Sequence, residues 1–140
     1  MPVYPPPALL LAALIVSMSA CVTNDQARSQ SGECNVYSDQ RTRLRAFDPY
    51  LLPNLRSTGG GDETAIVFVN CTGSEISYYW IDRDGVERYY GRIEPESDAI
   101  QHSFEGHIWV VKTGDGVNLS VFRASRAMSL AFVTPETPRG

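Results

Sequence analysis

The segment from residue 98 to residue 111 carries the side chains of this sequence that are best suited to chemistry. Asp98, His102 and Ser103 are the residue types of an acid, a base and a nucleophile. Adjacent residues of a strand point to opposite faces, so His102 and Ser103 cannot meet as base and nucleophile. The segment therefore predicts no catalytic residue and no enzyme activity.

A metal site has even less support. The sequence has 2 histidines, His102 and His107, and they stand an odd number of positions apart, so a strand would point them to opposite faces. No Cys-x-x-Cys pair and no acidic cluster lies beside them. We expect no metal and no cofactor.

A binding site suits the segment better. Trp109 offers a flat apolar wall, and Ser103 and His107 offer a hydroxyl and an imidazole for a buried polar group. The alternative is that Trp80 and Trp109 are core residues and that His107 is an interior histidine with its hydrogen bonds satisfied. Patterning alone favours this alternative.

The elements that position these residues are short strands. From Thr64 onward, β-branched and aromatic runs alternate with turn residues at intervals of about ten, which is typical of a sandwich or barrel. The expected strands cover residues 65–70, 76–81, 86–90, 99–103, 107–112, 117–122 and 130–133. We predict an all-β fold, a small antiparallel β-sandwich at residues 64–134, followed by a tail at 135–140.

The period of two assigns side chains to faces. Tyr78 and Trp80 share one face of the second expected strand, and His107 and Trp109 share one face of the fifth. The run at 65–70 is continuously apolar, as in a strand buried on both faces. Asp84-Gly85 is expected to supply the positive φ angles of a tight hairpin turn.

The net charge and the distribution of basic residues make nucleic acid an unexpected partner. The 140 residues carry a formal net charge of −4, and the 12 basic residues are scattered along the sequence. Binding to nucleic acid requires basic residues gathered on one surface.

The N-terminal residues predict export. Residues 8–20 are apolar and uncharged, too short to span a bilayer comfortably but suited to a signal peptide at 1–20. The run ends Met18-Ser19-Ala20-Cys21, which resembles the lipobox of bacterial lipoproteins. We expect a periplasmic or cell-surface protein held in the membrane by a lipid on Cys21, the alternative being an ordinary signal peptide and an unmodified Cys21.

Residues 21–63 have a polar composition that ends in three glycines, which predicts a largely disordered tether. The patch at 46–52 is the exception, and it suits a short turn or helix that docks on an edge of the domain. Cys34 and Cys71 form a possible disulfide in an oxidising compartment. Alternatively, Cys71 is a small apolar residue at a strand end.

A longer stretch resembles a known family. VFVNCTGSEISYYWIDRDGVERYYGRIEPESDAIQHSFEGHIWVV is similar to the β domain of the von Hippel-Lindau tumour suppressor family through Asn70, Trp80, Asp84-Gly85, Tyr90 and the pattern His-Ser-aromatic-x-Gly-His-x-Trp. The resemblance implies a sandwich that binds a peptide containing 4-hydroxyproline.

The resemblance also assigns roles. Trp80, Tyr90 and Trp109 match the aromatic walls around the pyrrolidine ring, and Ser103 and His107 match the pair that hydrogen-bonds its hydroxyl. His102 matches a rim residue that contacts the peptide backbone. A site shaped for a hydroxyl discriminates against unmodified proline, because its polar groups would be left unpaired.

Two departures limit what is carried over. The polar residues with which the family contacts its peptide would fall at 59–61, which are glycines here, and Phe104 stands where the family often has Tyr. The sequence also ends after the β domain, without the helical region that recruits elongin C in the family. We therefore expect no elongin C and no ubiquitin-ligase partner.

Together these features predict an extracytoplasmic peptide-binding module, whose ligand contains a residue like hydroxyproline. The alternative is a structural or assembly lipoprotein of the envelope, which docks a partner by an edge strand or by the patch at 47–52.

Overall fold

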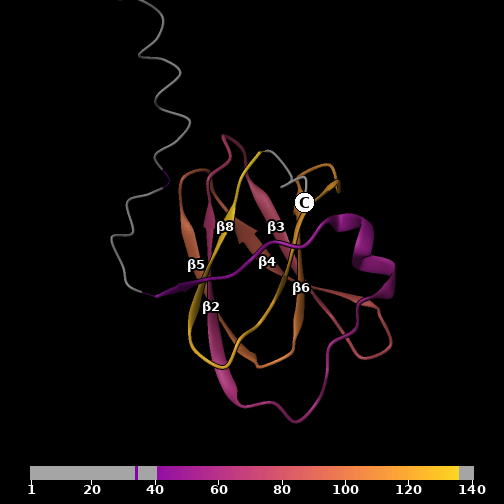
Figure 1. Ribbon diagram of the computed structural model, residues 1–140. Coiled ribbons are helices and arrows are strands. Elements are labelled where there is room, and N and C mark those ends of the chain that lie inside the picture. Colours follow the sequence, from indigo (N-terminus) through magenta and orange to yellow (C-terminus); the bar gives the residue numbers. More distant parts are fainter. Residues whose placement is uncertain (1–33, 35–40, 136–140) are drawn as a thin grey trace, which may run out of the picture.

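The fold is a sandwich of two four-stranded sheets (Figure 1), seen in a computed structural model that describes residue 34 and residues 41–135. In chain order the elements are β1 (Thr42–Arg43), the 3-10 helix η3 (Pro49–Asn54), β2 (Glu63–Asn70), β3 (Ile76–Ile81), β4 (Glu87–Ile93), β5 (Asp98–Phe104), β6 (Ile108–Thr113), β7 (Asn118–Arg123) and β8 (Ser129–Val133). One sheet has the order β1-β8-β2-β5, and the other has the order β4-β3-β6-β7. The predicted all-β sandwich is confirmed.

The pairing directions differ from the prediction in one respect. β8 lies between β1 and β2 and is parallel to both, whereas the other pairings are antiparallel. The sandwich is therefore mainly antiparallel, as predicted, and the parallel pairings are confined to β8. Local alternation reveals that a segment is a strand, but it carries no information on which distant strand lies beside it.

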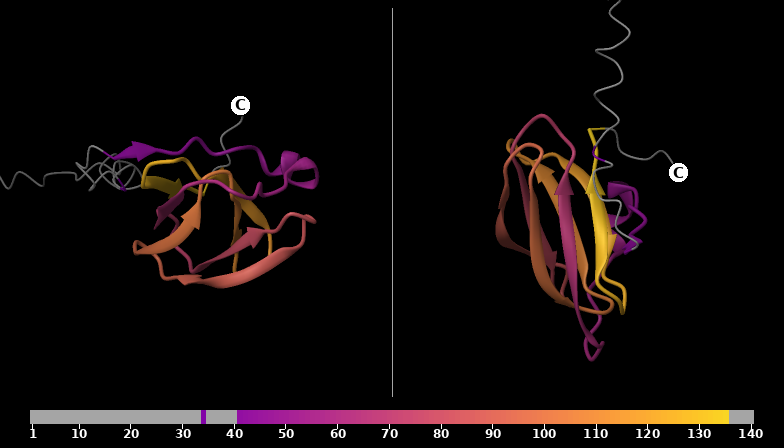
Figure 2. Two further views of the ribbon diagram at one scale, coloured as in Figure 1. Left: turned by 90° about the horizontal axis from the view of Figure 1, so that it is seen from below. Right: turned by 90° about the vertical axis from the view of Figure 1, so that its left-hand side faces the viewer.

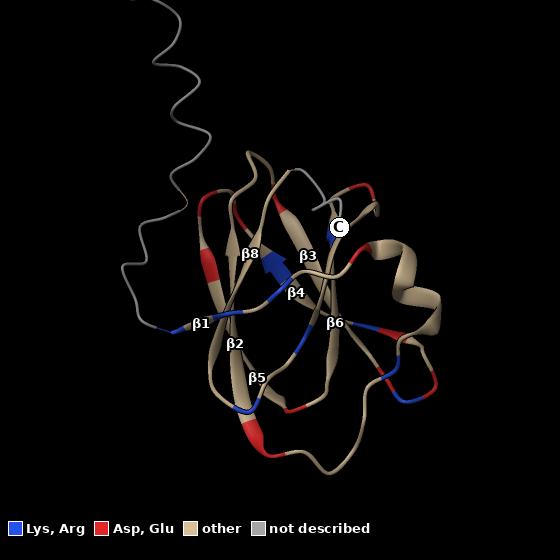
Figure 3. Ribbon diagram, viewed as in Figure 1, with Lys and Arg blue, Asp and Glu red and all other residues tan. Residues whose placement is uncertain are grey.

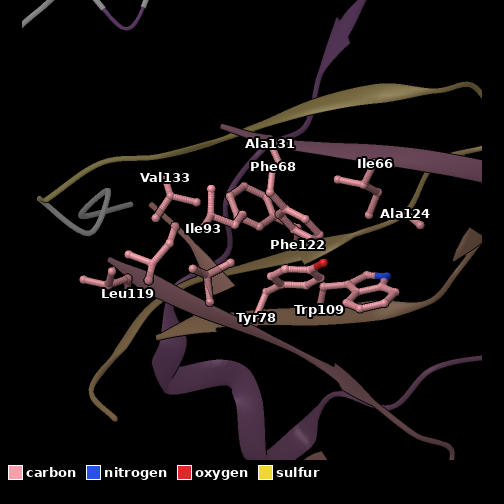
Figure 4. Packing of buried hydrophobic residues seen from close by; sticks show 12 residues of the cluster. Ile66, Phe68, Tyr78, Ile93, Trp109, Leu119, Phe122, Ala124, Ala131 and Val133 are labelled. Atoms are coloured by element: carbon pink, nitrogen blue, oxygen red, sulfur yellow. The ribbon is translucent and has the colours of Figure 1, made fainter. Parts of the chain in front are cut away.

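The core lies between the two sheets and is rich in aromatic rings (Figure 4). The Phe68 ring lies 5.0 Å from that of Tyr78 and 5.8 Å from that of Trp109 between centroids, both in tilted or edge-on contact. Tyr78 and Trp109 point inward as the period of two predicts. β2 is buried on both faces, since Phe68 faces this core and Val67 packs with Leu130 on the outer side.

Residues 41–57, called here the covering segment, pack against the sandwich, so the predicted tether is wrong for this part of the chain. The Phe47 amide donates a 2.7 Å hydrogen bond to the Val121 carbonyl at the edge of β7. Phe47, Leu52 and Leu55 then cover the outer apolar face formed by β3, β6 and β7. Figure 2 shows the segment running across the outside of the sandwich.

The short docking turn or helix expected at 46–52 agrees with η3 and with the contact of Phe47 at the edge of β7. The rest of the covering segment was not predicted, because its apolar residues follow neither strand nor helix spacing. They are fixed instead by an outer face that is apolar and needs cover. Ser57 completes the attachment, since its buried hydroxyl donates to the Ile81 carbonyl and accepts a 2.8 Å hydrogen bond from the Ile108 amide.

The glycine loop at 58–61, which suggested a linker, packs closely against neighbouring backbone. A Cβ on Gly61 would lie 2.2 Å from the Glu105 carbonyl oxygen, and one on Gly106 would lie 2.0 Å from the Thr58 hydroxyl. Gly106 also has a φ of 86°, which favours glycine. The loop at 58–61 is therefore packed against the turn between β5 and β6.

Cys34 and Cys71 are joined by a disulfide, with their Cα atoms 5.4 Å apart. The bond fixes Cys34 beside the outer face of β2 and β8. The predicted signal peptide and Cys21 lie outside the described residues. In the part that is described, no helix is long and apolar enough to cross a membrane.

The hairpin between β3 and β4 differs from the expected turn. Only Gly85 has a positive φ, of 85°, and Asp84 does not. The Asp82 carboxylate organises the turn, because one oxygen accepts from the amides of Asp84 and Val86 at 2.9 and 2.8 Å. The other oxygen accepts from the Arg88 guanidinium at 3.1 Å.

Candidate functional site

The predicted site residues come from both sheets at one end of the sandwich. Trp80 and Trp109 face each other across β3 and β6, and Thr64 and Ser103 face each other across β2 and β5. β4 and β5, which follow each other in the chain, form the edges of the two sheets beside this end. The candidate site is the set Trp80, Tyr90, Ser103, His107 and Trp109.

Trp109 is both a core residue and a wall of this site. Its side chain is buried, and its indole Nε1 donates a 2.9 Å hydrogen bond to the hydroxyl of Ser103, which is buried as well. The ring of Tyr90, which is half exposed, stands edge-on to the indole at 4.9 Å between centroids. The two interpretations of Trp109 from the sequence therefore do not exclude each other.

His107 is held between aromatic rings. Its imidazole lies 5.1 Å from the Trp80 ring and 5.4 Å from the Phe104 ring between centroids. Partial burial holds the pKa of His107 below its usual value, and the charges of Arg83 and His102 lower it further. His107 is therefore a neutral imidazole at neutral pH, able to accept a hydrogen bond at one nitrogen and donate one at the other.

Two buried polar atoms at this end have no hydrogen-bond partner among the described residues: the indole Nε1 of Trp80 and the hydroxyl of Thr64. Thr64 stands directly opposite Ser103, and alternation along β2 points it inward with Ile66. Buried polar groups are usually paired with protein, water or ligand, so both atoms are candidates for a hydrogen bond to a bound polar group or water. Sequence reasoning missed Thr64, since threonine is an ordinary strand residue.

His102 projects away from the candidate site. It is exposed, contacts the Phe104 ring at 5.1 Å between centroids and lies with Nε2 2.6 Å from the Glu63 carboxylate. Ser103, its neighbour, is buried on the opposite face of β5. The structure therefore keeps a base and a nucleophile apart here, and places His102 on the rim next to Phe104.

No group of three or more His, Cys, Asp or Glu side chains that could hold a metal ion occurs within the described ranges. The polar atoms of the candidate site are hydroxyls, indole N–H groups and one imidazole. These are groups that hydrogen-bond a neutral polar ligand.

Comparison with known protein families identifies residues 55–124 as a VHL beta domain. This chain belongs to the VHL beta domain family. The match includes Ser57 and the glycine loop, and it runs from β2 through β7. Among curated proteins, no match was found.

Membership of the VHL beta domain family indicates the general function of the candidate site. The VHL beta domain is a recognition domain that binds protein or peptide partners in its family, and it is not a catalytic one. The aromatic rings and the buried hydroxyl gathered by β3, β4, β5 and β6 are consistent with such recognition. A binding module is thus the general function of this VHL beta domain.

Proposed function

We propose that this chain is an extracytoplasmic peptide-binding module whose candidate site takes a hydroxylated proline-like residue of an extended peptide. The observation that carries the proposal is the hydrogen bond from Trp109 to Ser103. It fixes a buried hydroxyl among the aromatic side chains of Trp80, Tyr90 and Trp109.

The hydrogen bonds of a bound hydroxyl follow from this arrangement. Because the Ser103 oxygen already accepts from Trp109, its own O–H is available to donate to the ligand oxygen. The neutral imidazole of His107 would accept the proton of the ligand hydroxyl. The proposed relay therefore runs from Trp109 through Ser103 and the ligand to His107.

The same arrangement would discriminate against proline. An unmodified ring would leave the buried Ser103 hydroxyl without its second partner, in addition to Thr64 and Trp80, which already lack one. Leaving a buried polar group unpaired costs about 1–3 kcal/mol. That cost corresponds to roughly 5- to 150-fold weaker binding of the prolyl peptide.

Calorimetry with matched hydroxyprolyl and prolyl peptides tests the proposal. We expect the wild-type chain to prefer the hydroxyprolyl peptide, and His107→Phe to lose that preference while keeping the fold. Ser103→Ala alone would be a poor test, because it also leaves the indole N–H of Trp109 unpaired. His102→Gln on the rim is the matched control, and equal affinity of the wild type for both peptides would refute the proposal.

A second candidate function is docking of an envelope partner by the patch at 47–52 or by an edge strand. The structure divides this patch, since Phe47 and Leu52 face inward while Tyr50 is 89% exposed and Leu51 is 46% exposed. β5 ends its sheet and has one edge unpaired among the described strands. Loss of partner capture in Tyr50→Ser/Leu51→Ser, with capture kept in His107→Phe, would favour docking over the peptide site.

Export and a lipid anchor at Cys21 are part of the proposal and rest on the residues before Cys21. The disulfide between Cys34 and Cys71 suits an oxidising compartment. Cys21→Ser should release the protein from the membrane fraction of expressing bacteria. An unchanged membrane fraction would refute the anchor.

A further inference from the structure

A groove of about 620 Å³ includes Glu105 and Gly106, which belong to the turn between β5 and β6, in its lining. The covering segment, the glycine loop at 58–61 and the end of β7 form its walls. Among the side chains that line it are Arg45 and Arg123. Figure 3 shows the basic positions of β1 and the segment after it, which crosses the sandwich.

The two arginines form a like-charge pair. Phe47 bridges Val121 in antiparallel orientation, and Arg45 and Arg123 each stand two residues from this bridge and line the same groove. Neither guanidinium has a hydrogen bond or an ion pair with the residues that the structure describes. Both side chains are exposed, and an anion held between them would relieve the repulsion that like charges on neighbouring strands exert.

The acidic residue of the groove does not neutralise the pair. Glu105 contributes its side chain to an ion pair with Arg126 at 3.7 Å, and Asp62 holds the same guanidinium at 2.9 Å. The chain as a whole is acidic, with a net charge of −4. The positive groove is therefore a local feature and not part of a generally basic surface.

The walls indicate which anion would fit. Phe47 and the buried Ala124 supply apolar surface beside the guanidinium groups, which suits a carboxylate carried on a hydrocarbon stem. Guanidinium groups present N–H donors in a planar fork that matches a carboxylate. The glycine loop leaves room for close approach, since nothing lies within 4 Å of a Cβ built on Gly60.

We infer that this groove is a subsite for an acidic side chain, Glu or Asp, of the same peptide that occupies the candidate site. The inference rests on the proposed function, because one turn carries both places. Phe104 and His107 contact each other on the side of the candidate site, and Glu105 and Gly106 line the groove. An extended peptide advances about 3.3 Å per residue, so a position a few residues away reaches across the turn.

The test uses the full chain and four peptides that combine hydroxyproline or proline with Glu or Gln at the flanking positions. The wild type should bind the Glu peptides roughly tenfold more tightly than the Gln peptides at low salt, and less so at high salt. Arg45→Gln/Arg123→Gln should lose this preference. Arg56→Gln/Arg92→Gln has the same change in charge away from the groove and should keep it.

The outcomes separate the two proposals. A Glu preference without a hydroxyproline preference supports the groove and refutes the proposed function of the candidate site. A Glu preference that persists in Arg45→Gln/Arg123→Gln, or that the wild type lacks, refutes the groove. If none of the four peptides binds, an acidic peptide without proline is titrated into the wild type while the amide resonances of Gly60 and Gly106 are followed. If these resonances do not shift, the groove is also refuted as an acidic subsite.

Folding of the variant is checked by its melting temperature. Removal of the repulsion between Arg45 and Arg123 should leave the melting temperature unchanged or raise it. A large fall would mean that the pair has a structural role, and it would contradict the inference.

Discussion

Asn70 ties the two sheets together at the end of the sandwich that lies away from the candidate site, and we predict that Asn70→Ala strongly destabilises the protein. The side chain is fully buried at the end of β2. Its amide nitrogen lies 2.8, 3.0 and 3.0 Å from the carbonyls of Ser74, Ile93 and Glu94, so its two N–H groups are shared among three acceptors. Its oxygen accepts from the Thr72 amide and hydroxyl at 2.9 and 2.7 Å.

The size of the expected loss of stability follows from the number of hydrogen-bond partners of the Asn70 side chain. Each hydrogen bond contributes about 1 kcal/mol net, and partly buried groups left without a partner cost more. The loss of this set should lower the free energy of unfolding by about 3–5 kcal/mol. A domain of this size has about 5–15 kcal/mol in total. The melting temperature should fall by roughly 15 °C or more.

Urea unfolding followed by tryptophan fluorescence measures the effect. The control is Asn54→Ala, the same substitution at an exposed position that ends η3, which should change stability by less than about 0.5 kcal/mol. Asn70→Ala should lower the midpoint without changing the slope. A loss of stability smaller than about 1 kcal/mol would show that Asn70 is not the link between the sheets described above.

Three further predictions concern the hairpin turn, the covering segment and the candidate site. The pKa of Asp82 is lowered chiefly by the Val86 amide, so Asp82 stabilises the fold above its unfolded pKa of about 3.9 and ceases to do so as the pH falls through its folded value. Urea midpoints between pH 7 and pH 3 should therefore fall more for the wild type than for Asp82→Asn, and parallel curves would contradict this. Phe47→Ala should cost about 2–4 kcal/mol in urea unfolding, since it uncovers the outer face. The lowered pKa of His107 keeps the imidazole neutral at pH 7. Affinity for a hydroxyprolyl peptide should therefore stay constant as the pH falls to the usual histidine value of about 6.5 and decline below it. A decline in affinity that begins above this pH would be inconsistent with a neutral acceptor.

Strands with a regular alternation of apolar and polar residues could be predicted from the sequence, and so could the faces of Tyr78 and Trp109. The reason is that this alternation is local and each inward side chain follows from the pleat. The gathering of Trp80 and His107 into one cluster was reached only through the family resemblance, because alternation cannot tell a core ring from a ligand-facing one.

Other features depend on contacts between distant parts of the chain and were not predicted. Beyond the turn or helix expected at 46–52, the covering segment takes its conformation from the outer face that it covers, and Phe47 pairs with Val121, which is far away in the sequence. The place of Thr64 in the candidate site could not be predicted, because it depends on the pairing of Thr64 with Ser103 across β2 and β5. The presence of Arg45 and Arg123 in one groove likewise requires the register of two segments that the sequence does not connect.

The place of β8 has a consequence for the order in which the protein folds. β8 is the last of the described strands, yet it lies between β1 and β2 in its sheet and pairs with both in parallel. The first sheet therefore cannot close until β8 has left the ribosome. Until then β2 presents an open apolar edge, and the high contact order of the missing pairing makes its closure slow. For this chain, the period between synthesis and closure is when aggregation competes most strongly with folding.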